Sequence, residues 1–129
     1  MDRWSSLGEW AEAYIRAQDS YEDSDESHPD RPAIYEFMVE LTGNLAEECW
    51  AGILQVVKRR PSEKVLGMVG AGLLEDLLNC SGPQFIDRLE LQARMDPVFR
   101  RMLHSAWESG PPEVWARVEL ARATPDNSA

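Results

Sequence analysis

The sequence of 129 residues lacks long apolar runs, and no stretch of about 18 apolar residues is available to span a bilayer. Met1-Asp2-Arg3-Trp4 is not a basic segment followed by an apolar stretch, so we expect no signal peptide. Cysteine is scarce, because Cys49 and Cys80 are too few for a disulfide framework. We therefore expect two reduced, buried thiols in a cytoplasmic protein.

The chain also lacks an excess of basic residues. It has 13 Lys and Arg against 23 Asp and Glu, a formal net charge of −10. A protein that binds nucleic acid needs a basic stripe to displace counterions from phosphate, and an anionic membrane repels an acidic chain. We expect no direct binding to nucleic acid or membrane. The expected partner is a protein with a basic surface.

The acidic residues are unevenly distributed. Residues 1–48 hold 13 acids and 3 bases, whereas residues 49–129 hold 10 of each, so the net charge belongs to the front of the chain. Residues 19–31 are rich in Asp, Glu and Ser and predict an acidic mobile loop. We assign partner binding to the carboxylates of this part: Glu22, Asp23, Asp25, Glu26, Asp30, Glu36 and Glu40.

No stretch alternates apolar and polar residues with period two, so no sheet is expected. Apolar residues recur instead at three- and four-residue steps, and 43% of the chain is hydrophobic, enough for one helical domain over residues 1–123. The fold class is all-α, an irregular multi-helix bundle or stacked helical hairpins with seven to eight short helices. Residues 124–129 predict a frayed polar tail.

Capping and breaking residues place the expected helices. The first runs from Ser5 or Ser6 to Gln18, and the second begins near Pro32. Asn44 caps a central helix that Lys58-Arg59-Arg60 and Pro61 close. Ser62 caps the next helix, and Gly70-Ala71-Gly72 breaks it from the helix that follows. Ser81 and Pro83 begin another helix, and Asp96-Pro97 caps the one after it, with Trp107 on its inner side. A last helix is built on Val114, Trp115 and Val118.

Few residues suggest catalysis or metal binding. Glu75 and Asp76 are neighbours and point about 100° apart on a helix, which disfavours an acid/base pair. The glycines of 67–72 do not follow a phosphate-binding order. His28 lies in the acidic loop, and His104 is expected to contact Glu108 on the surface. We expect no enzyme, no catalytic residue, no cofactor and no metal, although a site built from Glu75, Asp76 and His104 is the enzymatic alternative.

Three segments resemble a family of short bacterial proteins of unknown function. They are Ala71-Gly72-Leu73-Leu74-Glu75-Asp76-Leu77-Leu78, Phe85-Ile86-Asp87-Arg88 and Asp96-Pro97-Val98-Phe99-Arg100, with Trp50 as the tryptophan of a preceding helix. The resemblance spans about Trp4 to Val118, and the family often has proline where Leu73 stands. It implies a bacterial, cytoplasmic, all-helical protein found among genes of conflict systems, and it implies no activity.

These features lead to one functional expectation. A non-enzymatic inhibitory protein would use its acidic N-terminal part to neutralise a basic partner, and an immunity protein against a cognate toxin, such as a nuclease, is its most specific form. One alternative is an acidic inhibitor that imitates nucleic acid in phage–host conflict. Another is a structural adaptor or oligomer subunit that uses apolar helix faces.

Overall fold

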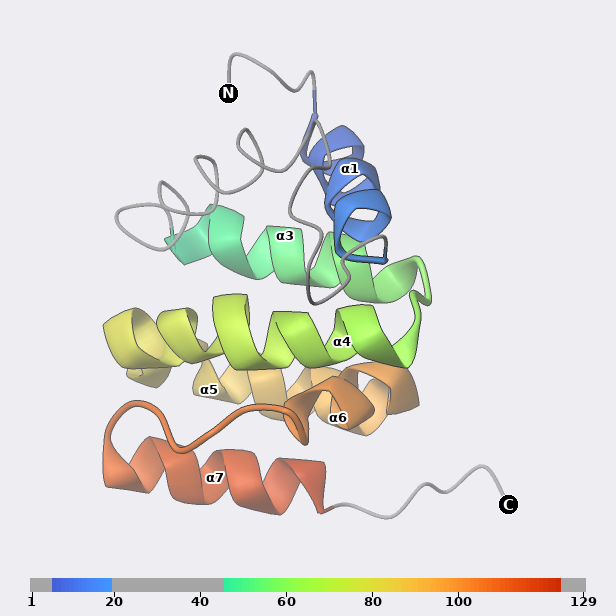
Figure 1. Cartoon of the computed structure of the whole chain (residues 1–129). Helices are drawn as coiled ribbons and strands as arrows, with labels where there is room; N and C mark the ends of the chain where they lie inside the picture. Colours follow the sequence, from blue (N-terminus) through green and yellow to red (C-terminus); the bar gives the residue numbers. More distant parts are fainter. Residues whose placement is uncertain (1–5, 20–45, 124–129) are drawn as a thin grey trace.

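The computed structural model of the chain describes residues 6–19 and 46–123. Within these ranges every regular element is helical, which confirms the all-α class (Figure 1). The elements are α1 (Leu7–Asp19), α3 (Ala46–Lys58), α4 (Glu63–Val69), the π-helical turn η1 (Gly70–Leu74), α5 (Glu75–Met95), α6 (Pro97–Leu103) and α7 (Pro112–Arg122).

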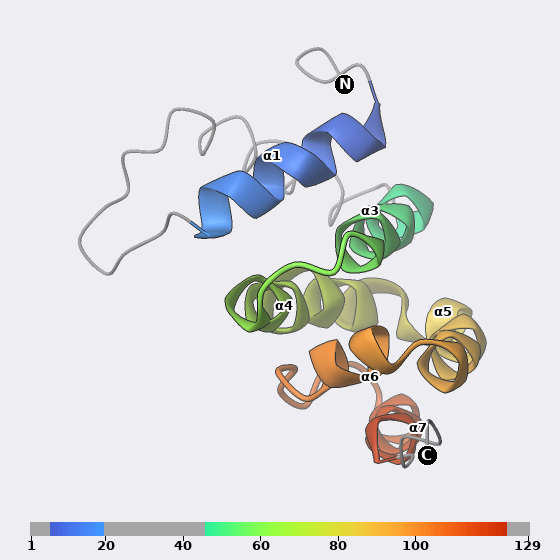
Figure 2. The same cartoon turned by 90° about the vertical axis from the view of Figure 1, so that its right-hand side faces the viewer.

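The helices form a stack that begins with α1 and ends with α7 (Figures 1 and 2). α1 packs on α3 and α4, α3 packs on η1 and α5, and α5 packs on α6 and α7. The segment 104–111 leads the chain back, so that α7 runs alongside α5 in the same direction (Figure 1). α1 and α7 therefore lie at opposite ends of the stack.

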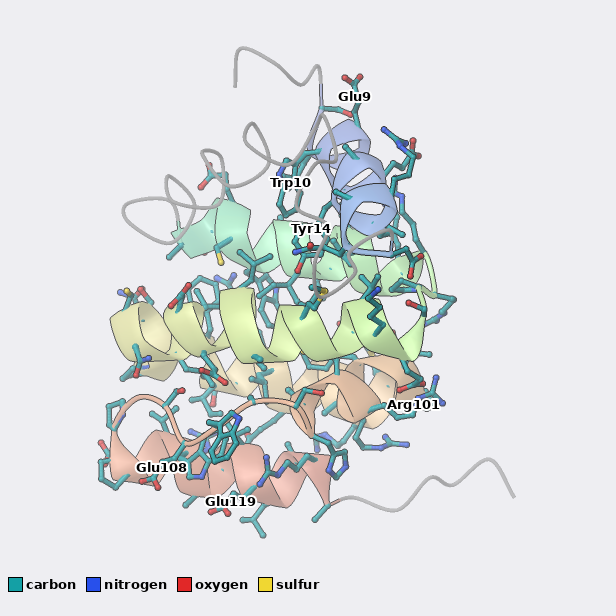
Figure 3. The ribbon with its side chains drawn as sticks, viewed as in Figure 1. Glu9, Trp10, Tyr14, Arg101, Glu108 and Glu119 are labelled. Atoms are coloured by element: carbon teal, nitrogen blue, oxygen red, sulfur yellow. The ribbon has the colours of Figure 1, made fainter. Side chains whose placement is uncertain are left out.

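Aromatic side chains connect the layers of the core. Trp10 and Tyr14 lie on the side of α1 that faces α3, with ring centroids 5.2 Å apart (Figure 3). Trp50 of α3 contacts Phe85 of α5 at 5.9 Å and Phe99 of α6 at 5.7 Å. The buried apolar side chains of all the described helices form one continuous cluster, which holds the stack together.

Two expected helix caps are confirmed. The hydroxyl of Ser62 accepts a hydrogen bond from the Val65 N–H at 3.3 Å at the start of α4. Asp96 caps α6 by accepting from the Val98 N–H at 3.0 Å, with Pro97 in the first turn. Each side chain satisfies a backbone donor that the first turn of a helix leaves without a partner.

The expected number of seven to eight helices is wrong for the described residues, which hold fewer separate helices. One reason is that Gly70-Ala71-Gly72 does not break the chain, and η1 joins α4 to α5 without interruption. A methyl group on Gly70 would come within 2.5 Å of the Met102 carbonyl oxygen, so this glycine permits close packing against the end of α6. The expected helix near Pro32 lies outside the described residues.

Other boundaries are partly confirmed. Ser81 has non-helical backbone angles inside α5, so the expected division there is a kink within one helix. The helix expected to include Trp107 ends at Leu103, and the Trp107 side chain is 78% exposed, so its assignment to an inner face is wrong. Cys49 is buried as expected, but Cys80 is exposed, and both are thiols.

Candidate protein-binding surface

All seven carboxylates assigned to partner binding lie between residues 20 and 45, outside the described residues. His28, Asn44 and the polar tail 124–129 also lie outside the described residues. The described chain flanks this segment with Asp19, the last residue of α1, and Ala46, the first residue of α3. The charge of the segment is nevertheless fixed by the sequence: seven acids and Arg31 give it a net charge of −6.

Two acids of the front part are bound by arginines from later helices. Glu47, in the first turn of α3, accepts two hydrogen bonds of 2.7 Å from the guanidinium of Arg88 on α5. Glu12 of α1 lies 3.5 Å from Arg59 at the end of α3. These two carboxylates connect layers of the stack, so they differ in role from the acids assigned to a partner.

Asp19 fixes the point where the acidic segment leaves α1. Its carboxylate accepts a hydrogen bond of 2.6 Å from the Ser62 hydroxyl, and its backbone carbonyl accepts one of 3.2 Å from Lys64. Both donors belong to the start of α4 and the residue before it. The end of α1 is therefore attached to α4, which adds to the apolar contact between these helices.

Hydrogen bonds from arginine favour the ionised form of two carboxylates. The Arg88 hydrogen bonds lower the pKa of Glu47 below its ordinary value, against a smaller opposing effect of desolvation. Arg117 lowers the pKa of Glu90 in the same way. A donor that binds the charged form of a carboxyl group favours loss of its proton.

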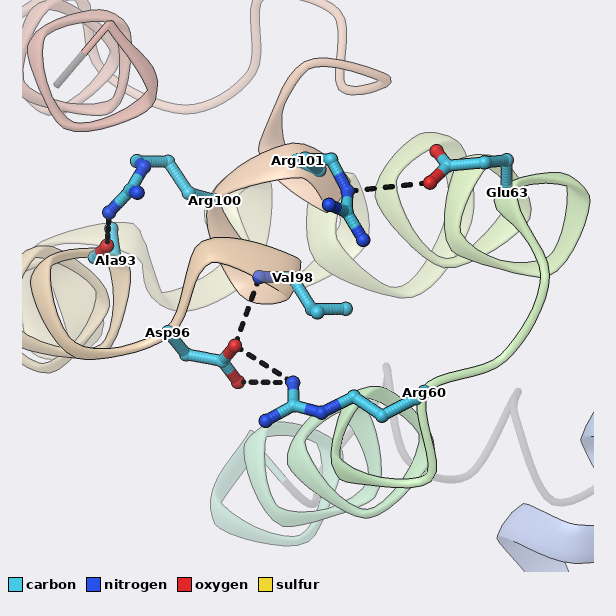
Figure 4. A network of polar contacts seen from close by, with 7 residues as sticks. All are labelled: Arg60, Glu63, Ala93, Asp96, Val98, Arg100 and Arg101. Carbon is cyan, nitrogen blue, oxygen red and sulfur yellow. Dashed lines mark hydrogen bonds and ion pairs between the residues drawn. The ribbon is translucent and has the colours of Figure 1, made fainter. Parts of the chain in front are cut away.

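The later helices use their arginines for one another's acids. Arg117 of α7 contacts Asp87 and Glu90 of α5, each at 2.6 Å, and so joins the two parallel helices. Around α6, Arg60 donates to both oxygens of Asp96, Arg101 lies 3.3 Å from Glu63, and the buried Arg100 donates to the Ala93 carbonyl (Figure 4). Several of the charged side chains of residues 49–129 therefore form ion pairs with one another within the fold.

The segment 104–111 is held by side chains of α5. The Trp107 N–H donates to Glu75 at 2.8 Å, and the Gly110 N–H donates to Asn79 at 2.8 Å. Gly110 has a φ of +78°, which only glycine adopts readily, and a Cβ there would meet the Leu78 carbonyl oxygen at 2.7 Å. Glu108, on this segment, and Glu119, on α7, mark this end of the stack in Figure 3.

No hydrogen bond or ion pair joins Glu75, Asp76 and His104, the polar residues considered for catalysis. Glu75 is engaged by the Trp107 amide, and Asp76, whose pKa is raised chiefly by desolvation, is exposed beside it. His104 and Glu108 make no ion contact, contrary to expectation, because α6 ends before His104 and the one-turn spacing is lost. Residues 6–19 and 46–123 contain no cluster of three metal-ligating side chains.

One shallow cleft opens between α5 and α7. It has a volume of about 240 Å³ and is lined by Glu90 and Arg94 of α5 and by Leu120 and Ala121 of α7. Leu120 is 72% exposed, and Leu91 and Met95 on α5 are 52% and 64% exposed. Sequence analysis did not single out these residues. The spacing of apolar residues on α7 could have indicated this surface, because Leu120 falls outside the helix face formed by Val114, Trp115 and Val118.

The model of a family of unknown function, DUF6869, matches residues 20–125. The chain belongs to this family. The matched range includes the segment 20–45 and the segments between Trp50 and Trp107 on which the resemblance was founded. No curated protein and no solved structure matches the chain. Among the described helices of this family member, none combines the length and the apolar content needed to cross a bilayer.

Proposed function

We propose that the chain is a non-enzymatic inhibitory protein that neutralises a basic protein partner with the carboxylates of residues 20–45. The observation that carries the proposal is the separation of charge. A net charge of −6 lies in this segment, whereas residues 49–129 are neutral. A dense set of carboxylates accelerates encounter with a cationic surface and forms directed hydrogen bonds with its arginines.

The ion pairs of the helical stack support the proposal. Six arginines have carboxylate partners among the described residues: Arg59, Arg60, Arg88, Arg101, Arg117 and Arg122. These are nearly half of the 13 basic residues of the chain. The chain as a whole has 23 acids against 13 bases, so its own cations cannot balance the acids of 20–45, and an external cationic surface is the better match.

An immunity protein is the most specific form of this function. A toxin that cleaves nucleic acid has a basic active site, and carboxylates that occupy the site would exclude the phosphate backbone. The acidic inhibitor that imitates nucleic acid acts by the same chemistry on a wider range of targets. A single captured partner that stays bound to the chain in excess duplex DNA supports the immunity protein, whereas capture of many nucleic-acid-binding proteins supports the mimic.

The test is affinity capture from a lysate of the source organism, followed by salt titration of the purified complex. The triple variant Glu22→Gln, Asp23→Asn, Asp25→Asn removes three charges from the segment. Its matched control, Glu48→Gln, Asp76→Asn, Glu108→Gln, removes three exposed charges elsewhere. We expect the first variant to lose affinity by about tenfold or more and the control to keep it.

The dependence on salt provides the second readout. Affinity of the native chain should fall steeply between low and high salt, because screening weakens contacts between exposed charges. A complex whose affinity is the same at both salt concentrations, or that both triple variants weaken equally, contradicts the proposal.

A further inference from the structure

The end of the stack formed by α5 and α7 exposes apolar side chains between charged ones. We define the α5–α7 surface as Leu91, Arg94 and Met95 of α5 with Glu113, Ala116 and Leu120 of α7. All six residues are exposed, and Arg94 and Leu120 line the same cleft. Exposed apolar groups that adjoin across two helices are typical of binding surfaces.

α7 occupies a terminal position, because no further described helix packs on its outer side (Figures 1 and 2). The last helix of a stack ordinarily has a polar outer face, since this face contacts water. On α7 the exposed positions include Ala116 and Leu120 beside the acids Glu113 and Glu119, so this face is only partly polar. The two arginines of α7 point back to the stack: Arg117 binds Glu90, and Arg122 donates to the Ala106 carbonyl at 3.3 Å.

We propose that the α5–α7 surface binds the same surface of a second copy of this chain across a two-fold axis. In such a dimer each patch contacts itself, so its charges must be self-complementary. Arg94 and Glu113 meet this requirement. Among the described residues neither of them makes an ion pair, and they lie toward opposite ends of α7, since Glu113 is in its first turn and Arg94 borders Ala121.

The geometry of a two-fold pairing follows from these positions. When the two α7 helices cross in antiparallel fashion, the start of one lies beside the end of the other. Arg94 of each copy then approaches Glu113 of the other copy, while Leu120 and Ala116 fill the centre of the contact. The small side chain of Ala116 allows the helices to approach closely, and the charges fix their direction.

The distribution of charge favours a second copy as the occupant. Two chains of net charge −10 repel each other, but the excess charge lies in residues 1–48. The described acids of that part lie on α1, at the far end of the stack from α7, and at the start of α3, where Arg88 neutralises Glu47 (Figure 1). Packed helices are about 8–10 Å apart and charges are screened over about 8 Å, so contact through α7 keeps the acids of α1 in the two copies several screening lengths apart.

Sedimentation equilibrium and light scattering over about a hundredfold range of concentration test this dimer. We expect the mass to rise with concentration from 14.6 kDa to twice this value. Leu120→Asp should make the chain monomeric throughout the range. Trp107→Ser is the matched control, because it removes another exposed apolar side chain that lies outside the surface, and it should leave the dimer intact.

Exchange of charges tests the orientation. Arg94→Glu and Glu113→Arg should each raise the dimer dissociation constant by about tenfold, and the double variant should restore it. Circular dichroism checks that every variant keeps its helices, which the exposure of the substituted side chains leads us to expect. A native chain that is monomeric at every concentration overturns the proposal, and so does a dimer that tolerates both Leu120→Asp and Arg94→Glu.

Discussion

The carboxylate of Glu75 accepts a hydrogen bond from the backbone N–H of Trp107, over a distance of 2.8 Å. The bond joins the first residue of α5 to a loop that begins after α6, 32 residues later in the chain. This hydrogen bond gives Glu75 a structural role within the segment 71–78, one of the three segments that resemble the family. The same loop sends the Trp107 side chain into solvent, so a fixed backbone holds an exposed tryptophan.

Replacement of Glu75 by leucine should loosen the loop 104–111 without unfolding the stack. The Trp107 amide then loses its acceptor, and we expect its hydrogen exchange to accelerate by about tenfold. Glu75→Gln retains a side-chain oxygen at the same position and should keep most of the protection. Equal exchange rates in the two variants would contradict this role of the side-chain acceptor. Amide exchange followed by NMR provides the measurement.

Asp96 should contribute more to stability than other surface carboxylates. It is 9% exposed, caps α6 and receives two hydrogen bonds from Arg60, at 2.8 and 3.0 Å. Asp96→Ala removes the cap and leaves Arg60 without this partner, and we expect the free energy of unfolding to fall by about 2–3 kcal/mol. Asp96→Asn retains a capping oxygen and should cost about 1 kcal/mol.

Glu63→Gln is the control for the Asp96 variants. Glu63 also contacts an arginine of α6, Arg101, but its side chain is 76% exposed. Exposed ion pairs contribute little, so the expected change is within about 0.5 kcal/mol. Denaturation in urea measures all three variants, and a loss for Glu63→Gln as large as that for Asp96→Ala would show that general charge, not capping, matters.

Two glycines of η1 should respond oppositely to alanine. A Cβ on Gly70 would lie 2.5 Å from the Met102 carbonyl oxygen and 3.0 Å from the Ser105 Cβ, so α6 must shift. We expect Gly70→Ala to destabilise the fold by about 2 kcal/mol. A Cβ on Gly72 meets nothing within 4 Å, and Gly72→Ala should stabilise the helix by about 0.5 kcal/mol. Thermal unfolding distinguishes the two outcomes, and equal shifts of Tm would contradict the packing argument.

The two thiols should differ in reactivity. Burial raises the pKa of Cys49 to about 12, whereas Cys80 is exposed. At about pH 8 a disulfide reagent should label Cys80 in the folded protein and Cys49 only after unfolding, since the thiolate is the reactive form. Cys80→Ser should therefore remove labelling of the native state. Rapid labelling that persists in Cys80→Ser would contradict the burial of Cys49.

The raised pKa of Cys49 also predicts that the folded protein loses stability at high pH. The unfolded thiol loses its proton near its ordinary value of 9.0, before the folded one does. Between this value and about 12 the folded state binds more protons, so the free energy of unfolding should fall as pH rises. Cys49→Ala should remove this contribution to the slope in pH-dependent urea denaturation, and an unchanged slope would contradict the assignment.

Short-range patterns were sufficient to predict much of the helical stack. The spacing of Val114, Trp115 and Val118 identified the buried side of α7, and Ser62 and Asp96 identified two helix starts. These signals depend on the 3.6-residue period and on the first turn of a helix, both of which are local. The charge separation on which the functional proposal rests is also a property of the sequence alone.

Contacts between distant residues were decided by the tertiary structure. The pattern predicted a break at Gly70, yet this residue has right-handed helical angles, and its missing side chain lets α6 pack closely against it. Trp107 fitted an inner position by its spacing, yet it is exposed because α6 ends at Leu103 and Glu75 holds the following loop. A local pattern records which residue types recur along a helix, whereas the exposure of α7 and its cleft with α5 depends on which helices pack together.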